Sequence, residues 1–278
     1  MSTPRSAKAF VPGHVTGLFT VHRVAEPARS GSRGAGVTLA DGVTVQLEPA
    51  DQRRVLVDGD PMAVDAVDRV LDALDVSASL RIETDLPLGT GFGLSGGMAL
   101  GAALAANQAF DLARSENELI RIAHVAEVTA GTGLGDVVAQ ARGGMPLRLE
   151  PGAPPHGELD GIPATGRVEF LALGELSTPD ILDERPGIIT EAGTEALERL
   201  RSQPTPARFM EASRSFADDV GLVTPDLRDI LEAVSAAGGT ASMAMLGETV
   251  FALGRDLSDA GFDPAVSAID RPGATIIE

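Results

Sequence analysis

The chain has 278 residues, of which 44% are hydrophobic, and its 22 basic residues are outnumbered by 40 acidic ones, giving a net charge of −18. This aliphatic content is typical of a folded chain with a sizeable core and excludes a disordered one. Nucleic acids and anionic membranes bind basic faces, so the charge argues against both partners. Lys8 is the only lysine. Such an acidic chain suits a salt-rich cytoplasm, where self-repulsion is screened.

Several classes of site are excluded by composition. The chain has no cysteine, so disulfides, thiolate metal sites and cysteine nucleophiles are absent. Its 4 histidines are dispersed and lack the spacing of a zinc site. No apolar run is long enough to span a bilayer, and the N-terminal residues do not resemble a secretory signal. We therefore expect a cytoplasmic protein without a membrane partner.

The first 84 residues show mainly strand patterns. Residues 8–22 predict a strand, a turn at Pro12-Gly13 and a second strand. Residues 29–36 predict a loop, and residues 36–48 a hairpin around Asp41-Gly42. Further predicted elements are a strand at 54–57, a helix that begins at Asp60-Pro61 and a strand at 80–84.

The segment 87–99 is the strongest candidate for chemistry, because it places five glycines and a serine between the strand 80–84 and an apolar helix at 98–110. Glycines at such a turn let the backbone approach an anion closely. The helix N-terminus then offers unpaired N–H groups and a partial positive charge. The segment therefore predicts a phosphate-binding loop.

Two carboxylates follow at positions suited to phosphoryl transfer. The capping box at 115–118 begins a helix that ends at Gly131, and this helix carries His124 and Glu127 one turn apart. A second glycine-rich turn then ends in Asp136. Mg²⁺ prefers hard oxygen ligands, and an acceptor hydroxyl needs a carboxylate to take its proton. Glu127 and Asp136 are candidates for these two tasks.

The remaining chain predicts a second half. A short helix at 137–142 and a strand at 147–149 precede a Pro- and Gly-rich segment, 151–166, which we expect to be a linker. We therefore divide the chain into halves 1–150 and 151–278. The second half is expected to contain a strand at 168–173, a turn at 177–180, helices at 188–200, 207–220 and 225–237, and strands at 241–246, 249–253, 265–269 and 275–277.

Other nucleotide and hydrolase motifs fit poorly. A Walker A loop needs a lysine after its glycines, and Lys8 lies far from them. Residues 91–96 match G-x-G-x-x-G, but no second strand ending in an acidic residue follows, which weakens a dinucleotide-binding interpretation without excluding it. Residues 93–97 match the letters Gly-x-Ser-x-Gly of a serine-hydrolase elbow, but nothing else in the sequence supports a serine hydrolase.

Three stretches resemble the motifs of the GHMP kinases. The segment Pro-Leu-Gly-Thr-Gly-Phe-Gly-Leu-Ser-Gly-Gly from Pro87 resembles their second motif, usually Pro-x-x-x-Gly-Leu-Gly-Ser-Ser-Ala. Val-Pro-Gly-His-Val-Thr-Gly-Leu-Phe from Val11 resembles the first, in which His14 replaces a lysine. The stretch 241–253 stands where the third is expected. The resemblance implies an α+β fold of two lobes, with a left-handed β-α-β unit in the N-terminal lobe, a ferredoxin-like C-terminal lobe and a dimeric assembly.

The residues that depart from these motifs resemble those of one archaeal branch of the family. Members of this branch phosphorylate pantoate with ATP on the way to coenzyme A. Leu94 replaces the first serine of the second motif, and the third motif lacks most of its glycines. Two alternatives stay open. One is a related kinase for another small hydroxy acid or alcohol, such as shikimate, and the other is a metabolite-binding regulator that has lost catalysis.

The resemblance also implies roles for individual residues. Glu127 and Ser95 are expected to bind Mg²⁺, and Asp136 to orient or deprotonate the acceptor. Arg148 is the favoured residue for the pantoate carboxylate, with an ordinary charge at a strand end as the alternative interpretation, and Arg33 is the second candidate. The expected ATP-binding residues are Pro87, Gly89, Gly91, Gly93, Leu94, Ser95, Gly96 and Gly97. The other expected pantoate contacts are Ser32, His124 and Thr178.

Overall fold

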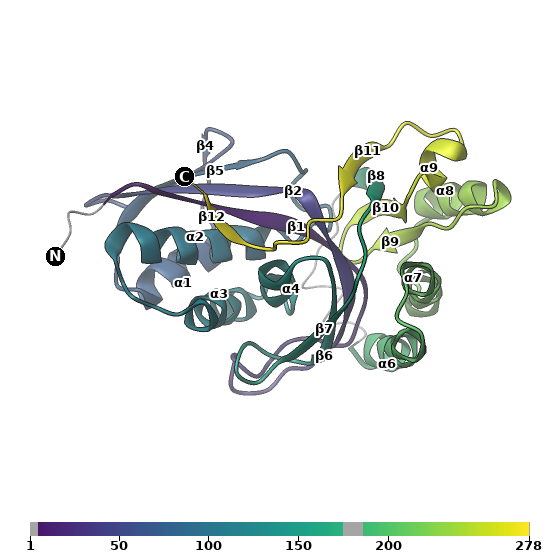
Figure 1. Ribbon diagram of the computed structural model, residues 1–278, viewed down its shortest axis with the longest axis horizontal. Helices are drawn as coiled ribbons and strands as arrows, with labels where there is room; N and C mark the ends of the chain where they lie inside the picture. The colour runs from purple at the N-terminus through teal and green to yellow at the C-terminus, as the bar shows by residue number, and fades with distance from the viewer. Residues whose placement is uncertain (1–4, 175–185, 278) are drawn as a thin grey trace.

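Two sheets with their helices lie side by side along the long axis of the molecule (Figure 1). The computed structural model describes residues 5–174 and 186–277. Strand β1 (Ala7–Phe19) belongs to the first sheet and reaches across to helix α7 (Pro206–Val220) of the second. The long strand β1 therefore packs in both parts of the fold.

The first sheet has the strand order β12-β1-β2-β5-β3-β4, and β6 and β7 extend it from β2. Its only parallel pair in the described ranges is β3 with β5, which the chain connects through helix α1. This connection is a β-α-β unit, as the resemblance implies. The strands other than β1 are β2 (Gly34–Pro49), β3 (Arg54–Val57), β4 (Asp60–Pro61), β5 (Ala78–Thr84), β6 (Met145–Glu150), β7 (Glu158–Ile162) and β12 (Thr275–Ile277).

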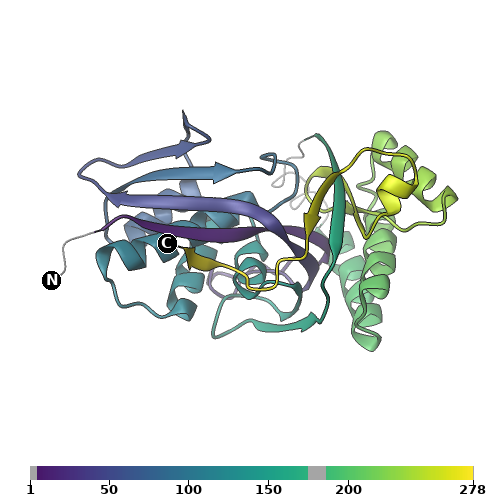
Figure 2. The same ribbon diagram turned by 45° about the horizontal axis from the view of Figure 1, so that its top comes forward.

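Four helices cover one face of this sheet (Figures 1 and 2). They are α1 (Asp65–Ala73), α2 (Leu94–Phe110), α3 (Glu116–Ala130) and α4 (Asp136–Arg142). Helix α2 is apolar on nearly every side because it is buried between the sheet and its neighbours. A Cβ atom at Gly101 would lie 2.6 Å from a methyl group of Val45 on β2, so this glycine permits the close approach.

The second sheet is antiparallel and has the order β11-β8-β10-β9. Apart from extra helices in its first crossover, the chain follows the β-α-β-β-α-β order of a ferredoxin-like fold, which confirms the expected architecture. Its elements are β8 (Arg167–Gly174), α6 (Pro186–Ser202), α7, α8 (Pro225–Ala236), β9 (Ser242–Ala244), β10 (Glu248–Leu253), α9 (Asp256–Asp259) and β11 (Ala265–Ala268).

The predicted turn at Pro12-Gly13 and the predicted hairpin at Asp41-Gly42 are both wrong. β1 and β2 are each one continuous strand, and Pro12 pairs with Gly42 at a β-bulge. Pro12 and Gly42 therefore lie opposite each other in the β1–β2 pair, where a bulge tolerates the missing proline N–H. A side chain at Gly13 would collide with Leu86, so glycine at this position lets Leu86 pack closely against β1.

Two further boundaries differ from the sequence prediction, and two elements were not predicted. α1 begins at Asp65 because Asp60-Pro61 forms strand β4, and α2 begins four residues before the predicted 98, at Leu94. The segment 151–166 contains β7, which pairs with β6, and the short helix α9 was not predicted. The prolines and glycines at 151–157 predicted a linker, whereas they form the turn between the neighbouring strands β6 and β7.

The other predicted helices and strands in the described ranges are confirmed to within a few residues. The turn expected at 177–180 lies outside the described residues. The division at residue 150 stays a prediction, and β7 and β12 from beyond it pair within the first sheet. None of the helices in the described part of the chain combines the length and apolar character needed to cross a membrane.

The approach of α2 to β2 can be tested by Gly101→Ala. The added methyl group collides with Val45, and such overpacking costs about 1–3 kcal/mol, part of which better helix propensity offsets. We expect a lower free energy of unfolding in urea. Gly187→Ala in α6, where no atom lies within 4 Å of the added Cβ, is the matched control and should not destabilise the protein. Equal stability of both variants would contradict this packing.

Candidate active site

A cavity of about 460 Å³ lies where the first glycine-rich segment meets the second half of the chain. Its size suits a small molecule or cofactor. Its walls come from the segment before α1, the glycine-rich loop, the end of α3 and the β9–β10 turn. The lining residues used below are Gly89, Gly91, Gly93, Leu94, Ser95, Gly96, Glu127, Thr132 and Asp136.

The glycine-rich loop needs its glycines for conformation and for close contact. Gly89, Gly91 and Gly93 have φ angles of 75°, 95° and 63°, in the left-handed region that other residues rarely adopt. A Cβ at Gly91 would lie 3.2 Å from the backbone nitrogen of Gly247 in the β9–β10 turn. The glycine-rich loop therefore packs directly against the β9–β10 turn of the second half of the chain.

The start of α2 opens into this cavity without a capping side chain. Gly93 is the N-cap residue, and the N–H of Gly97 donates to its carbonyl at 3.0 Å. A helix leaves the N–H groups before that point without intrahelical partners. Here they belong to Leu94, Ser95 and Gly96, which line the cavity. The helix end is therefore suited to an anion.

Side chains from two other elements hold this loop. The Gln140 side chain on α4 donates through Nε2 to the carbonyls of Pro12 and Gly93, each at 3.0 Å. The Thr249 hydroxyl on β10 donates to the carbonyl of Thr90 at 2.8 Å. Sequence analysis did not single out Gln140, because an amide in a short helix carries no distinguishing pattern.

A group of three oxygens forms between the start of α2 and the end of α3. Glu127 Oε1 accepts hydrogen bonds from Ser95 Oγ at 2.5 Å and from Thr132 Oγ1 at 2.6 Å. Burial raises the pKa of Glu127 to about 7, although both hydroxyl donors act to lower it. The structure thus brings the predicted pair Ser95 and Glu127 together and adds Thr132. The only signal for Thr132 was its place in the second glycine-rich turn.

Asp136 is the first residue of α4 and lies beside His14 on β1. His14 Nδ1 and Asp136 Oδ1 are 2.7 Å apart, and the imidazole is fully buried. Burial lowers the pKa of His14, so the ring is neutral and donates through Nδ1. Burial acts to raise the pKa of Asp136, but the His14 hydrogen bond and the Arg148 charge together hold it below its ordinary value. Asp136 is therefore an anion with one oxygen occupied.

Arg148 on β6 is a buried cation close to this pair. It is 2% exposed, its Nε donates to Ser32 Oγ at 3.2 Å, and its Nη1 has no hydrogen-bond partner among the described residues. Burial lowers the pKa of Arg148, whereas the Asp136 charge raises it. Arg33, the second candidate, donates through Nε to the carbonyl of Leu149. The structure thus pairs Arg148 with Ser32 and leaves donor capacity for an anion.

His124 is also buried, but its ring faces a loop of the chain. Nε2 donates to the carbonyl of Ser30 at 2.8 Å, and burial lowers the His124 pKa. Its expected contact with a substrate stays a prediction. Thr178, the remaining expected contact, lies outside the described residues.

The described residues contain no cluster of three or more His, Asp or Glu side chains that could hold a metal alone. Mg²⁺ seldom needs one, since it is commonly held by one or two carboxylates together with waters and substrate phosphates. Among the described residues that line the cavity there is no lysine or arginine, whereas Glu127 and Asp136 are acidic. A polyphosphate here requires a cation from solution, and Ser95 and Glu127 offer the oxygens for one.

Two family models match the chain. The model for the N-terminal domain of GHMP kinases matches residues 61–144, and the model for the GHMP kinase C-terminal domain matches residues 194–262. The first contains the glycine-rich loop, Glu127 and Asp136.

Relatives cover nearly the whole chain. The pantoate kinase of Thermococcus kodakarensis is 36% identical over 268 residues, which are 90% of this chain and 88% of that protein. The pantoate kinase of Methanocaldococcus jannaschii is 32% identical over 95% of this chain and 97% of its own. A solved structure described as a phosphotransferase related to the CoA biosynthesis pathway superimposes with a TM-score of 0.87 at 31% identity, covering 98% of both chains.

The raised pKa of Glu127 predicts a pH-dependent stability in the absence of divalent cations. The folded chain holds this proton more tightly than the unfolded chain, so its stabilising effect is complete below pH 4.5 and is lost as the pH rises through 7. Each unit of pKa difference corresponds to about 1.4 kcal/mol. Glu127→Gln cannot ionise, so its stability relative to wild type should grow by roughly 3 kcal/mol from pH 4 to pH 8.

Urea unfolding at several pH values, with a chelator present, measures this difference. Glu191→Gln, at an exposed position of α6, controls for the loss of one negative charge. A difference between Glu127→Gln and wild type that stays constant with pH would show that Glu127 ionises normally.

Proposed function

The chain belongs to the GHMP kinases, and we propose that it transfers the γ-phosphoryl group of ATP to the primary hydroxyl of pantoate, forming 4-phosphopantoate for coenzyme A synthesis. The observation that carries this choice of acceptor is the unpaired Nη1 of buried Arg148, close to Asp136. Pantoate has a carboxylate that the Arg148 guanidinium can bind and a hydroxyl that can donate to the Asp136 carboxylate. A planar guanidinium can bind the substrate carboxylate through two hydrogen bonds.

The nucleotide phosphates are assigned to the glycine-rich loop and the start of α2. The expected residues Pro87, Gly89, Gly91, Gly93, Leu94, Ser95, Gly96 and Gly97 all belong to this segment. Left-handed glycines expose the backbone there, and the uncapped N–H groups of α2 line the cavity. Several oriented N–H donors stabilise negative charge that increases on the phosphoryl group during transfer. The loop thereby offsets part of the charge without a lysine.

Ser95 and Glu127 are the residues assigned to Mg²⁺. Their oxygens lie 2.5 Å apart beside the loop, and both are hard ligands of the kind that Mg²⁺ prefers. When bound by Ser95 and Glu127, Mg²⁺ would supply positive charge to offset that of the phosphates. The burial that raises the pKa of Glu127 also favours binding of a cation, since the carboxylate has no basic side chain as a partner in the described residues.

Asp136 is assigned to the acceptor hydroxyl. Its Oδ1 is engaged by His14, which leaves Oδ2 to accept the hydroxyl proton as the hydroxyl oxygen bonds to phosphorus and ADP leaves. His14 donates one hydrogen bond and, being neutral, leaves the carboxylate its charge. The buried imidazole thus fixes the orientation of Asp136 in the place where related motifs carry a lysine.

Ser32 and Arg148 are assigned to the pantoate carboxylate, and His124 and Thr178 to its other oxygens. The Ser32 hydroxyl accepts from Arg148 Nε, so it also orients the guanidinium. His124 holds the backbone at Ser30, two residues before Ser32, which places its contribution near the same loop. A homodimeric assembly, a cytoplasmic location and a salt-rich archaeal source remain predictions from the resemblance and the acidic composition.

Turnover with a panel of acceptors tests the proposal. ADP release should be fast with pantoate and near background with shikimate, homoserine and mevalonate, in concentrated potassium salt that screens the net charge of −18. Turnover of another acceptor with none on pantoate would overturn the substrate. ATP binding without turnover of any acceptor would instead favour a regulator.

Asp136→Asn should keep the fold and lower kcat by about 10²- to 10⁴-fold, because the amide cannot take the hydroxyl proton. ATP binding, measured by calorimetry, should change little. Asp229→Asn, at an exposed position of α8, is the matched control and should behave as wild type. Normal turnover by Asp136→Asn would remove this residue from the acceptor side.

Arg148→Met should raise the KM for pantoate by at least about 30-fold, since a hydrogen-bonded charge pair contributes roughly 2 kcal/mol or more. The KM for ATP should stay near the wild-type value. Arg81→Met, at an exposed position of β5, is the control for the loss of one arginine. An effect confined to ATP would place Arg148 outside the acceptor pocket.

A further inference from the structure

The second glycine-rich turn brings one more hydroxyl to the Glu127 carboxylate. Thr132 Oγ1 donates to Glu127 Oε1 at 2.6 Å, and Ser95 Oγ lies 3.4 Å from the same threonine oxygen. Thr132 also lines the cavity. The three oxygens therefore form one group, although Ser95 lies on α2, more than thirty residues before Glu127 on α3 and Thr132 in the turn that follows α3.

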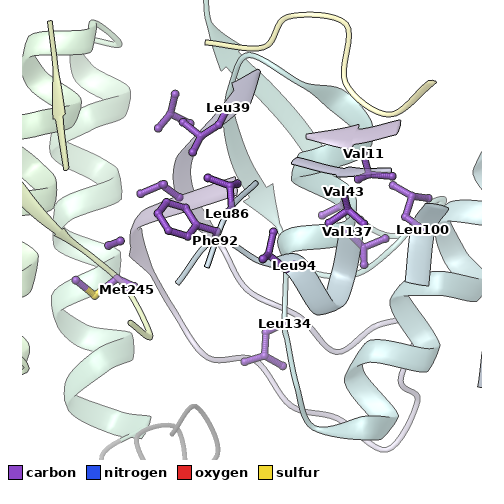
Figure 3. Close-up of a cluster of buried hydrophobic side chains, with 14 of the residues drawn as sticks. Val11, Leu39, Val43, Leu86, Phe92, Leu94, Leu100, Leu134, Val137 and Met245 are labelled. Carbon is purple, nitrogen blue, oxygen red and sulfur yellow. The ribbon is translucent and has the colours of Figure 1, made fainter. Parts of the chain in front are cut away.

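The phosphate loop itself supplies only one of these hydroxyls. Leu94 stands where the related motif carries a first serine, and its side chain is 5% exposed. Figure 3 shows Leu94 at the start of α2 with other buried apolar side chains, among them Phe92 and Leu134. Position 94 thus serves the core, and Ser95 is left as the only hydroxyl in the first turn of α2.

The hydrogen bond of Thr132 differs from the one a threonine usually makes near a helix end. Thr129, three residues earlier, donates to the carbonyl of Val125 in its own helix at 2.6 Å. Thr132 instead follows the C-cap Gly131 and donates to a side-chain carboxylate. The same turn also contacts the other carboxylate oxygen, because a Cβ at Gly133 would collide with Glu127 Oε2. Thr132 thus holds one oxygen of Glu127, and the absence of a side chain at Gly133 leaves room for the other.

We propose that Thr132 is a positioning residue that holds the Glu127 carboxylate for the divalent cation, in place of the hydroxyl that Leu94 lacks. The inference rests on the proposed cation site at Ser95 and Glu127. Partners that orient a metal-binding side chain commonly contribute 10- to 100-fold to metal affinity or activity. Thr132 therefore acts on cation binding through Glu127, without touching the acceptor.

Binding of Mn²⁺ alone, followed by electron paramagnetic resonance, tests this role. Thr132→Val keeps the shape of the side chain but loses the hydroxyl, so we expect its Mn²⁺ affinity to fall by about 10- to 100-fold. Thr132→Ser restores the hydroxyl and should restore the affinity. Thr129→Val, an exposed threonine whose hydroxyl bonds within α3, is the matched control and should bind Mn²⁺ as wild type does.

Kinetics provide the second measurement. For Thr132→Val, the Mg²⁺ concentration needed for half-maximal turnover should rise in proportion to the lost affinity, while kcat at saturating Mg²⁺ and the KM for pantoate stay close to wild type. Thermal unfolding checks that each variant is folded, and Thr132→Ala, which removes the same hydroxyl, must reproduce the loss if Thr132→Val is unstable. A purely structural role would lower the unfolding temperature and leave cation dependence unchanged.

Glu127→Gln separates this inference from the proposed function. If Glu127→Gln abolishes Mn²⁺ binding while Thr132→Val and Thr132→Ala bind as wild type, Thr132 has no positioning role and the cation site stands. If Glu127→Gln also binds as wild type, the cation site itself is wrong and the inference falls with it.

Discussion

The site depends on negative charge that is buried with little positive charge to balance it. Glu127 and Asp136 lie beside the same cavity, and the one buried cation near them in the described ranges is Arg148. His14 stands where a lysine is usual and is neutral because it is buried. In the proposed function, compensation comes from hydroxyls, from the N-terminus of α2 and from a cation supplied with the nucleotide. The proposal thus gives the site two ligands of opposite character, a cation for Glu127 and an anion for Arg148.

The side chains of the site must be placed accurately, and a few contacts between segments distant in the sequence hold them. β1 contributes His14 to the site and reaches the second half of the chain, while Gln140 connects α4 to both β1 and the phosphate loop. Thr249 attaches the loop to β10 from the other side. Hydrogen bonds to backbone carbonyls hold a loop without adding charge. The glycines can thus leave their backbone accessible and still keep a defined conformation.

Short sequence patterns predicted many helix ends and turns, because these depend on neighbouring residues in the chain. The capping box at Ser115 began α3 as expected, and glycines near Ser95 marked the turn between strand and helix. The breaker pair at Pro12 misled the prediction for the opposite reason, since the residue that accommodates it, Gly42, is thirty positions away. Thr132 went unassigned because its hydroxyl could equally have bonded its own helix, as that of Thr129 does.

The sequence by itself located the glycine-rich turn between β5 and α2 and singled out Glu127 and Asp136 as candidates, since both follow from residue type and spacing over short stretches. The class of fold followed from the resemblance of three motifs to those of the GHMP kinases. Only the tertiary structure decided that β1 is unbroken, that His14 is the partner of Asp136, and that Thr132 joins Ser95 at Glu127. These facts depend on burial and on contacts between distant segments. A buried imidazole loses its charge and a buried carboxylate raises its pKa, and neither environment is encoded in the neighbouring residues.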